Sequence, residues 1–348
     1  MNNKVLLLGG TGAMGMYLCE ILYDKGYDVI VTSRQERKDD RICYVKGNAH
    51  DYSFLEEILK TKYYAIVDFM LYSSAEFDFR IKKMLESCDL YVFLSSSRVF
   101  SPCSELIKED SPLLINASLQ NKYISNGCYS IYKANQERTL FEAGNNWIIV
   151  RPYITYSKER LPLGIFEKED WLYRAMAGRT IVFSKSVADK YTTLTHGRDV
   201  AMAIAGLISL NESVGQNYNV STSESVKWLD VLDMYLDVFE KHFGFRPKYI
   251  LTDDEKLIPD TDQAYNDRYF NRKFDNTKIS KAVSLRWENS LEGLKDCFEH
   301  FLKSPQFKTI SWKREGRKDR LTKEWTPLKE IPGMKNKAKY LICRFSGY

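Results

Sequence analysis

The feature that most limits what this chain can fold into is the glycine-rich turn Gly9-Gly10-Thr11-Gly12-Ala13-Met14-Gly15. The apolar run Lys4–Leu8 before it is typical of a buried strand, and the spacing of apolar residues over Ala13–Lys25 is helical. Glycines at such a turn let the backbone approach a pyrophosphate at the helix N-terminus. The turn therefore predicts dinucleotide binding by six of its residues: Gly9, Thr11, Gly12, Ala13, Met14 and Gly15.

Strand and helix patterns alternate over the first 150 residues. Further strands are expected at Asp28–Thr32, Ile42–Lys46, Tyr64–Phe69, Leu90–Leu94 and Trp147–Val150. Helices are expected from an N-cap at Ser53 to Lys60, at Glu76–Ser87 and at Tyr129–Ala143. This alternation predicts an α/β fold: a Rossmann-type, doubly wound parallel sheet with helices on both faces.

After Pro152 the pattern is less regular, which predicts a smaller mixed lobe for substrate. Helices are expected at Glu167–Ala177, Arg198–Leu210, Lys227–Phe243 and Leu291–Lys303, with strands at Thr180–Phe183, Tyr218–Val220 and Lys248–Leu251. The predicted division is a cofactor-binding domain at 1–152, a substrate lobe at 153–303 with segments returning to the first domain, and a basic extension at 304–348.

Composition narrows the class of protein. The chain is 44% hydrophobic and 28% charged, as in soluble globular proteins. It has neither an apolar run near the length of a membrane span nor a signal-peptide pattern, so a cytoplasmic location without membrane attachment is expected. Seven scattered cysteines and four distant histidines argue for reduced thiols and against a metal site.

The positive charge is concentrated at the end of the chain. From Lys303 onward there are 13 lysines and arginines against 4 acidic residues, a net +9 that leaves −4 on the other 302 residues. Such a segment can bind nucleic acid or another anionic partner. We expect instead a solvated or subunit-contacting extension, and nucleic acid is not the expected partner.

The end of the second strand bears on the choice of cofactor. NAD-binding proteins carry an acidic residue there, whereas this chain has Ser33 and Arg34, followed by Arg37 and Lys38. A hydroxyl and a guanidinium suit a 2′-phosphate, so NADP is predicted. Asp51 is a candidate for the adenine edge, although capping of a helix explains it nearly as well. Three residues at the end of the fourth strand would pack along the cofactor or simply fill the core: Phe69, Met70 and Leu71.

Two further motifs carry chemistry. Tyr129 and Lys133 are four residues apart on one face of a predicted helix, and a nearby ammonium lowers the pKa of a phenol. The phenol then becomes a usable acid or base near neutral pH. Ser95-Ser96-Ser97 ends the fifth strand, where ligands of such sheets bind, and a hydroxyl there can hold the reacting oxygen.

Together these motifs resemble the extended short-chain dehydrogenase/reductase family, in its sugar-nucleotide epimerase and dehydratase branch, over roughly residues 4–303. The resemblance rests on the glycine turn and on six later segments: LSSSRVF at 94–100, EDSPL at 109–113, YSIYK with Glu137, Arg151-Pro152-Tyr153, the stretch around His196 and Asp199, and FDNTK at 274–278. It implies Ser96, Tyr129 and Lys133 as the catalytic set, and Tyr153 and Ile154 against the nicotinamide.

Departures from the family pattern narrow the implied reaction. Members that remove water carry Asp-Glu after the catalytic hydroxyl, whereas this chain has Ser97-Arg98. The expected activity is therefore NADPH-dependent reduction of the 4-keto group of a nucleotide-linked 4-keto-6-deoxy sugar, such as a dTDP sugar for surface polysaccharide. The open alternatives are a 4-epimerase and a non-catalytic cofactor- or RNA-binding scaffold. The substrate candidates are Ser97, Arg98, Arg174, Lys190, Tyr191 and Arg268, and a homodimer is typical of the family.

Overall fold

The computed structural model describes residues 3–116, 128–253 and 267–346, and the chain divides into two compact units. Unit 1 comprises 1–157, 193–225 and 272–290; unit 2 comprises 158–192, 226–271 and 291–348. The first boundary lies after Ser157 rather than after Pro152. Two later segments belong to unit 1, and the basic extension belongs to unit 2 instead of forming a separate part.

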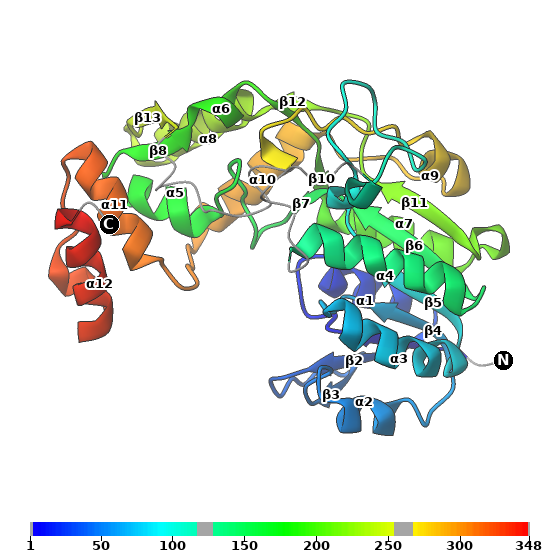
Figure 1. Ribbon diagram of the computed structural model, residues 1–348. Helices are drawn as coiled ribbons and strands as arrows, with labels where there is room; N and C mark the ends of the chain where they lie inside the picture. The colour runs from blue at the N-terminus through cyan, green and yellow to red at the C-terminus, as the bar shows by residue number, and fades with distance from the viewer. Residues whose placement is uncertain (1–2, 117–127, 254–266, 347–348) are drawn as a thin grey trace. The chain divides into compact units, whose positions relative to one another are not determined.

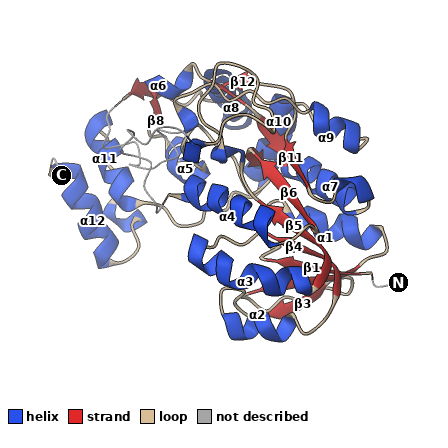
Figure 2. Ribbon diagram, turned by 45° about the vertical axis from the view of Figure 1, so that its right-hand side comes forward, coloured by secondary structure: helices blue, strands red, loops and turns tan. Residues whose placement is uncertain are grey.

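A seven-stranded parallel sheet forms the centre of unit 1, in the order β11-β6-β5-β4-β1-β2-β3 (Figure 2). The chain reverses its direction of travel across the sheet after β3, which gives the doubly wound arrangement and confirms the predicted Rossmann-type fold. The strands are β1 (Lys4–Leu8), β2 (Asp28–Ser33), β3 (Cys43–Lys46), β4 (Tyr63–Asp68), β5 (Cys88–Leu94), β6 (Trp147–Pro152) and β11 (Gln216–Val220).

Helices bury both faces of this sheet (Figure 1). One apolar cluster joins the sheet to α1, α7 and α9; the other joins it to α2, α3 and α4. Strands covered on both sides must be apolar on both sides, which explains the unbroken run Val5–Leu8. The helices are α1 (Gly15–Asp24), α2 (Tyr52–Ile58), α3 (Ser74–Glu86), α4 (Tyr129–Ala143), α7 (Gly197–Ile208) and α9 (Thr277–Ala282).

Short elements complete unit 1. β7 (Ile154–Tyr156) pairs in parallel with β10 (Leu194–His196), and neither strand was predicted. The 3-10 helices are η1 (Ser97–Val99), η2 (Leu114–Asn116) and η3 (Asn211–Ser213). The predicted N-cap of α2 is wrong by two residues, since Asp51 and not Ser53 caps the helix.

Unit 2 packs helices around aromatic rings. Trp171 of α5 stacks on Tyr235 of α8 with 4.3 Å between ring centroids, and Tyr235 meets Phe298 of α10 edge-on at 4.9 Å. The helices are α5 (Lys168–Met176), α6 (Lys185–Ala188), α8 (Trp228–Phe243) and α10 (Ser290–Lys303). Two short sheets pair β8 (Ile181–Ser184) with β13 (Tyr249–Thr252), and β9 (Tyr191–Thr192) with β12 (Val226–Lys227).

The basic extension is folded, which corrects the expectation of a solvated segment, while contact with another subunit stays a prediction. It forms α11 (Trp312–Thr322), η5 (Leu328–Glu330) and α12 (Met334–Phe345), and the two α-helices pack against each other. Trp312, Ile331 and Tyr340 form a buried core between them. The net charge did not predict this core, because net charge does not show which residues face inward.

Candidate functional site

Three of the four glycines in the turn at 9–15, Gly9, Gly12 and Gly15, have different roles. A Cβ on Gly15 would lie 2.3 Å from the carbonyl oxygen of Gly10, and one on Gly9 would lie 2.8 Å from Sδ of Met70. Gly9 also has a φ of +70°, a conformation that favours glycine. A Cβ on Gly12 would meet no described atom within 4 Å. Packing therefore requires Gly9 and Gly15, whereas Gly12 leaves open backbone of the kind that a pyrophosphate can approach.

The start of α1 supplies the complementary electrostatics. Met14, at the N-cap, makes no side-chain capping hydrogen bond with the residues that the structure describes. N–H groups at a helix start point along the axis and carry a partial positive charge, so they suit a phosphate. Thr32 Oγ1 accepts a hydrogen bond from the N–H of Gly9 at 2.9 Å, which ties the end of β2 to the turn. These residues fit a dinucleotide.

The residues after β2 form a local turn. The Ser33 hydroxyl donates to the carbonyl oxygen of Gln35 at 2.7 Å, while Arg34 is exposed. Arg37 reaches back to the first turn of α1, where its Nη1 lies 4.0 Å from Sδ of Met16, and its guanidinium lies 5.9 Å from the ring centre of Tyr44. The basic run of the sequence analysis therefore places a second guanidinium beside the helix that starts at the glycine turn.

Asp51 acts as a helix cap. Its Oδ1 accepts hydrogen bonds from the N–H of Ser53 at 3.0 Å and from the Ser53 hydroxyl at 2.7 Å. These bonds hold the pKa of the carboxyl below its usual range, because they favour the charged form. The capping alternative thus has contacts in the structure, and the adenine contact stays a prediction.

Lys133 is buried below the loop that follows β4. Its Nζ donates to the carbonyl oxygen of Met70 at 3.2 Å and lies 4.5 Å from the ring centre of Phe93. Burial lowers the pKa of Lys133 to about 8, although the nearby carboxyl groups of Asp68 and Glu137 act in the opposite direction. Of the predicted cofactor contacts on this loop, Phe69 and Met70 are half-buried and Leu71 is exposed.

Asp68 organises the same loop from inside the sheet. It is fully buried, and its carboxyl accepts hydrogen bonds from the N–H of Met70 at 2.8 Å and from the Tyr91 hydroxyl at 2.7 Å. Burial raises the pKa of this carboxyl. Because the carbonyl oxygen of Met70 accepts from Lys133, Asp68 holds the residue that binds the ammonium group. Asp68 is not among the site residues predicted from the sequence.

Ser96 and Tyr129 lie where η1 packs against the start of α4. The Ser96 hydroxyl accepts a hydrogen bond from the N–H of Arg98 at 3.2 Å, and the Arg98 guanidinium lies 5.0 Å from the ring centre of Tyr129. Lys133 follows Tyr129 by one turn of α4. The structure therefore gathers Ser96, Arg98, Tyr129 and Lys133 around η1 and the first turns of α4 in unit 1.

Behind this group lies a buried ion pair that sequence reasoning did not assign to the site. Arg151 donates from Nε and Nη2 to the two carboxylate oxygens of Glu137, at 2.9 and 2.7 Å. The Ser95 hydroxyl donates to the same carboxylate, and Arg151 also donates to the carbonyl oxygen of Glu109 at 3.0 Å. These contacts join β5, α4 and β6. The signal was present, since all three charged residues belong to the segments that carried the resemblance.

Two predicted substrate contacts, Ser97 and Arg174, have internal partners in the structure. Ser97 has no exposed surface, and its hydroxyl donates to the carbonyl oxygen of Arg151 at 2.8 Å. Arg174 is also fully buried, and it donates to Asp319, Glu315 and Glu324 at 2.6, 2.9 and 2.9 Å. These side chains hold the protein together, because their polar atoms are satisfied internally and they expose no surface to a ligand.

The remaining predicted residues lie as follows. Arg268 is buried in unit 2, where Nε donates to the carbonyl oxygen of Gly164 at 3.1 Å and the guanidinium contacts Asp267. Lys190 and Tyr191 are half-buried in the same unit. In unit 1, Tyr153 packs its ring on Phe274 at 4.9 Å between centroids, and Ile154 is buried in β7. Cofactor or substrate contact stays a prediction for these residues.

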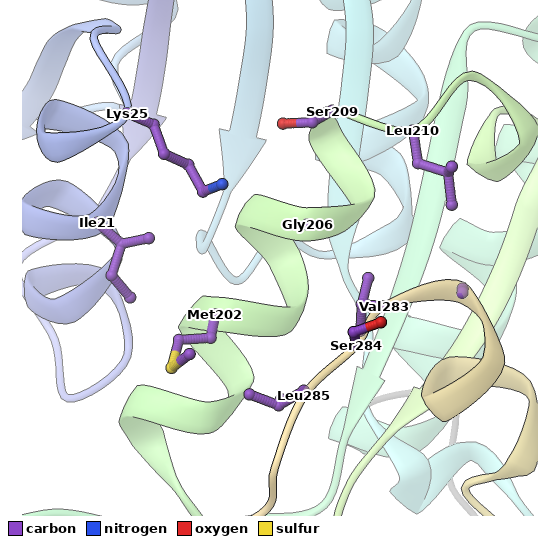
Figure 3. Close-up of a pocket in the computed structure, with 10 residues that line it drawn as sticks. Ile21, Lys25, Met202, Gly206, Ser209, Leu210, Val283, Ser284 and Leu285 are labelled. Atoms are coloured by element: carbon purple, nitrogen blue, oxygen red, sulfur yellow. The ribbon is translucent and has the colours of Figure 1, made fainter.

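A pocket of about 310 Å³ lies elsewhere on unit 1, between α1, α7 and the loop after α9 (Figure 3). Its lining is mainly apolar, and Lys25 points toward it from the end of α1. It contains none of the predicted site residues. Among the described residues, no group of three or more His, Cys, Asp or Glu could hold a metal ion, and no helix is long and apolar enough to cross a membrane.

Several proteins are similar to this chain over most of its length. It is 25% identical over 323 residues to chloroplast stem-loop binding protein of 41 kDa b from Arabidopsis thaliana, which covers 85% of this chain and 78% of that protein. UDP-glucose 4-epimerase from Bifidobacterium longum, solved with NAD+ and UDP, has a TM-score of 0.65 at 16% identity, covering 87% of this chain and 99% of that one. dTDP-glucose 4,6-dehydratase from Bacillus anthracis, solved with NAD, has a TM-score of 0.65 at 16% identity, covering 86% and 97%.

The decisive match is to a family model. It spans residues 5–221, which include the glycine turn, Ser96, Tyr129, Lys133 and the last strand of the parallel sheet. The resemblance inferred from the sequence motifs is thereby confirmed. The chain belongs to the NAD dependent epimerase/dehydratase family.

Proposed function

We propose that this protein reduces the 4-keto group of a nucleotide-linked 4-keto-6-deoxy sugar with NADPH, in the supply of sugars for surface polysaccharide. The observation that carries this proposal is the end of β2, where Ser33 and Arg34 occupy the place at which NAD-binding proteins carry an acidic residue, and where Arg37 lies beside α1. A cofactor from the NADPH pool favours net reduction over a cycle that regenerates its own cofactor.

The roles of the residues follow from their chemistry. When bound, NADPH supplies the hydride that the carbonyl carbon accepts. As the hydride adds to the carbon, the C–O π bond breaks and Tyr129 gives its phenolic proton to the oxygen, which yields the alcohol. Ser96 holds that oxygen by a hydrogen bond. Lys133 stabilises the phenolate that remains, until solvent returns the proton. The absence of an Asp-Glu pair after Ser96 leaves no acid and base for removal of water.

A 4-epimerase is the second candidate. Named structures of the same fold include a UDP-glucose 4-epimerase and a UDP-glucuronic acid 4-epimerase, both in complex with NAD. An epimerase would take a hydride from C4 of an intact sugar and return it to the other face, with no net consumption of cofactor. The same residues serve both reactions, because each passes through a C4 ketone.

One experiment separates the two candidates. The purified protein is incubated with NADPH and a panel of nucleotide-linked 4-keto-6-deoxyhexoses, and absorbance at the nicotinamide band is followed together with the sugar product. Loss of NADPH equal to the alcohol formed supports the reductase. Conversion of a nucleotide hexose to its C4 epimer without added cofactor contradicts reduction and establishes epimerisation. Tyr129→Phe, which removes only the phenolic hydroxyl, is the control for catalysis by this site.

Nucleic-acid binding is a separate candidate activity, favoured by the name of the Arabidopsis relative and by the surface of the extension. All four acidic residues of the extension have partners within unit 2, whereas six of its lysines are exposed: Lys308, Lys313, Lys323, Lys329, Lys335 and Lys339. Trp325 is 44% exposed and offers a stacking surface. Gel-shift titration with an RNA stem-loop tests this, and binding that Lys335→Glu/Lys339→Glu leaves unchanged would exclude this surface.

A homodimer through α4 is proposed from the family pattern. Analytical ultracentrifugation of the purified chain tests it directly. A monomer across the micromolar range would contradict the proposal.

A further inference from the structure

The side chain of Arg98 has a specific place beside the phenol of Tyr129. Its guanidinium lies 5.0 Å from the centre of the tyrosine ring, within the range of a cation–π contact. The residue belongs to η1, whose N-cap is Ser96, and its N–H donates to the Ser96 hydroxyl at 3.2 Å. The backbone of Arg98 is thus held by one predicted catalytic residue while its side chain covers another.

Tyr129 has a second cation on its own helix, but that cation loses charge in a useful pH range. Lys133 is buried, and burial lowers its pKa to about 8. Half of the Lys133 side chains are therefore neutral near pH 8, and most are neutral one unit higher. An arginine stays protonated at any pH a protein tolerates. The Arg98 guanidinium can therefore keep a constant positive charge beside the Tyr129 phenol while the Lys133 ammonium titrates.

The charged groups on the neighbouring elements differ between the Lys133 side and the Arg98 side of Tyr129. On the side of Lys133, the acidic groups Asp68 and Glu137 raise its pKa. On the side of Arg98 lies Arg272, whose pKa is lowered by burial; Tyr153 and Cys103 act in the opposite direction, and the charge of Arg98 lowers it further. Arg272 donates to the carbonyl oxygens of Phe100 and Ser101, both at 3.2 Å. Arg98 and Arg272 therefore both place positive charge near η1.

We propose that Arg98 is a positioning residue that acts through Tyr129, because its permanent charge over the phenol ring stabilises the phenolate. The phenol can then release its proton at neutral pH and also above the range in which Lys133 is charged. Arg98 was predicted as a substrate contact, whereas its place over the phenol ring gives it a different role. This role builds on the proposed function of Tyr129 as proton donor, but its test needs no substrate and is independent of the reaction.

The test measures the titration of Tyr129 itself. Full-length protein labelled with [ζ-¹³C]tyrosine is titrated by NMR, and the Tyr129 signal is identified by its loss in Tyr129→Phe. In the unmodified protein the Tyr129 pKa should lie below the value of about 10 for a free tyrosine. Arg98→Gln should raise it by about one unit, as a charge some 5 Å away does in a partly solvated site. Arg98→Lys keeps the charge and should restore most of the shift.

A matched control excludes a general effect of removing a cation. Arg41 lies over the ring of Tyr23 at 5.9 Å, in the same unit, so Arg41→Gln makes the same chemical change at an exposed pair. It should leave the titration of Tyr129 unmoved. A Tyr129 pKa near 10 or above in the unmodified protein would overturn the proposal without any variant. So would an unchanged pKa in folded Arg98→Gln, or a full return to about 10 in Lys133→Met with Arg98 in place.

Discussion

Arg174 Nη1 lies 2.6 Å from Asp319 Oδ1, although 145 residues separate them in the sequence. The same guanidinium reaches Glu315 and Glu324, so one buried arginine of α5 binds three carboxylates of the basic extension. The extension is therefore part of the folded core of unit 2. An arginine that looked like a ligand for an anionic substrate instead neutralises the acidic side of α11.

Arg174→Met is expected to release the extension from α5. The change leaves Glu315 and Asp319 buried without their main cation, and breaking a buried pair in this way costs roughly 3–5 kcal/mol. Limited trypsin digestion should then cleave within 304–348 much faster than in the unmodified protein. Arg246→Met is the control, since Arg246 makes exposed ion pairs on α8 of the same unit. Equal cleavage rates for the two variants would contradict the anchoring role.

Alanine at two glycines of the turn should separate folding from cofactor binding. In Gly15→Ala the new Cβ meets the Gly10 carbonyl oxygen at 2.3 Å, so the strand and helix must move apart and unfolding should occur at lower urea. In Gly12→Ala the Cβ meets no described atom within 4 Å, so stability should change little while NADPH affinity falls at least tenfold. Urea unfolding and fluorescence titration with NADPH measure both. Undiminished affinity in Gly12→Ala would refute pyrophosphate binding at this backbone.

Removing one partner of the Glu137–Arg151 pair should lower the free energy of unfolding more than replacing both partners with apolar residues. Each side chain is almost completely buried, so Arg151→Met leaves a buried carboxylate and should destabilise by about 3–5 kcal/mol. The double variant Glu137→Leu/Arg151→Met removes both charges and should recover a large part of that loss. A double-mutant cycle by urea unfolding measures the coupling. Additive effects would mean that the two side chains are not coupled through their bond.

Lys133 should make stability rise with pH. Its pKa is about 8 in the folded chain against an ordinary value of 10.5, so the fold disfavours the charged form. Below pH 8 both states are protonated and the penalty is complete. Between pH 8 and 10.5 the unfolded chain binds more protons than the folded one, so the penalty falls as pH rises.

The gain in unfolding free energy of Lys133→Met over the unmodified protein should therefore shrink by roughly 2 kcal/mol from pH 7 to pH 10. Urea unfolding at the two pH values measures it. Lys82→Met, at an exposed position of α3, is the control and should show no such trend. A gain that is constant or grows with pH would show that Lys133 is not buried as a charged group.

Local pattern was sufficient for the parallel sheet and the cofactor turn. The runs Lys4–Leu8 and Tyr129–Ala143 form a strand and a helix with the predicted bounds, because apolar periodicity acts over a few residues and needs no distant partner. The predicted strand at Tyr218–Val220 also exists. Its place at the edge of the large sheet, beside β6, could not be read locally, since pairing joins residues about 70 apart.

The sequence by itself determined the glycine turn, the strand–helix alternation and the spacing of Tyr129 and Lys133, and with them the family. Only the tertiary structure decided which partners Arg98, Ser97 and Arg174 have. All three are polar residues near predicted site motifs, and the sequence gives each the same interpretation. Their roles differ because the fold brings Arg98 over a phenol ring, buries Ser97 against a backbone carbonyl and surrounds Arg174 with carboxylates from more than 140 residues away. The free energy of a charge or a hydroxyl depends on such partners and on burial, and neither is a local property of the chain.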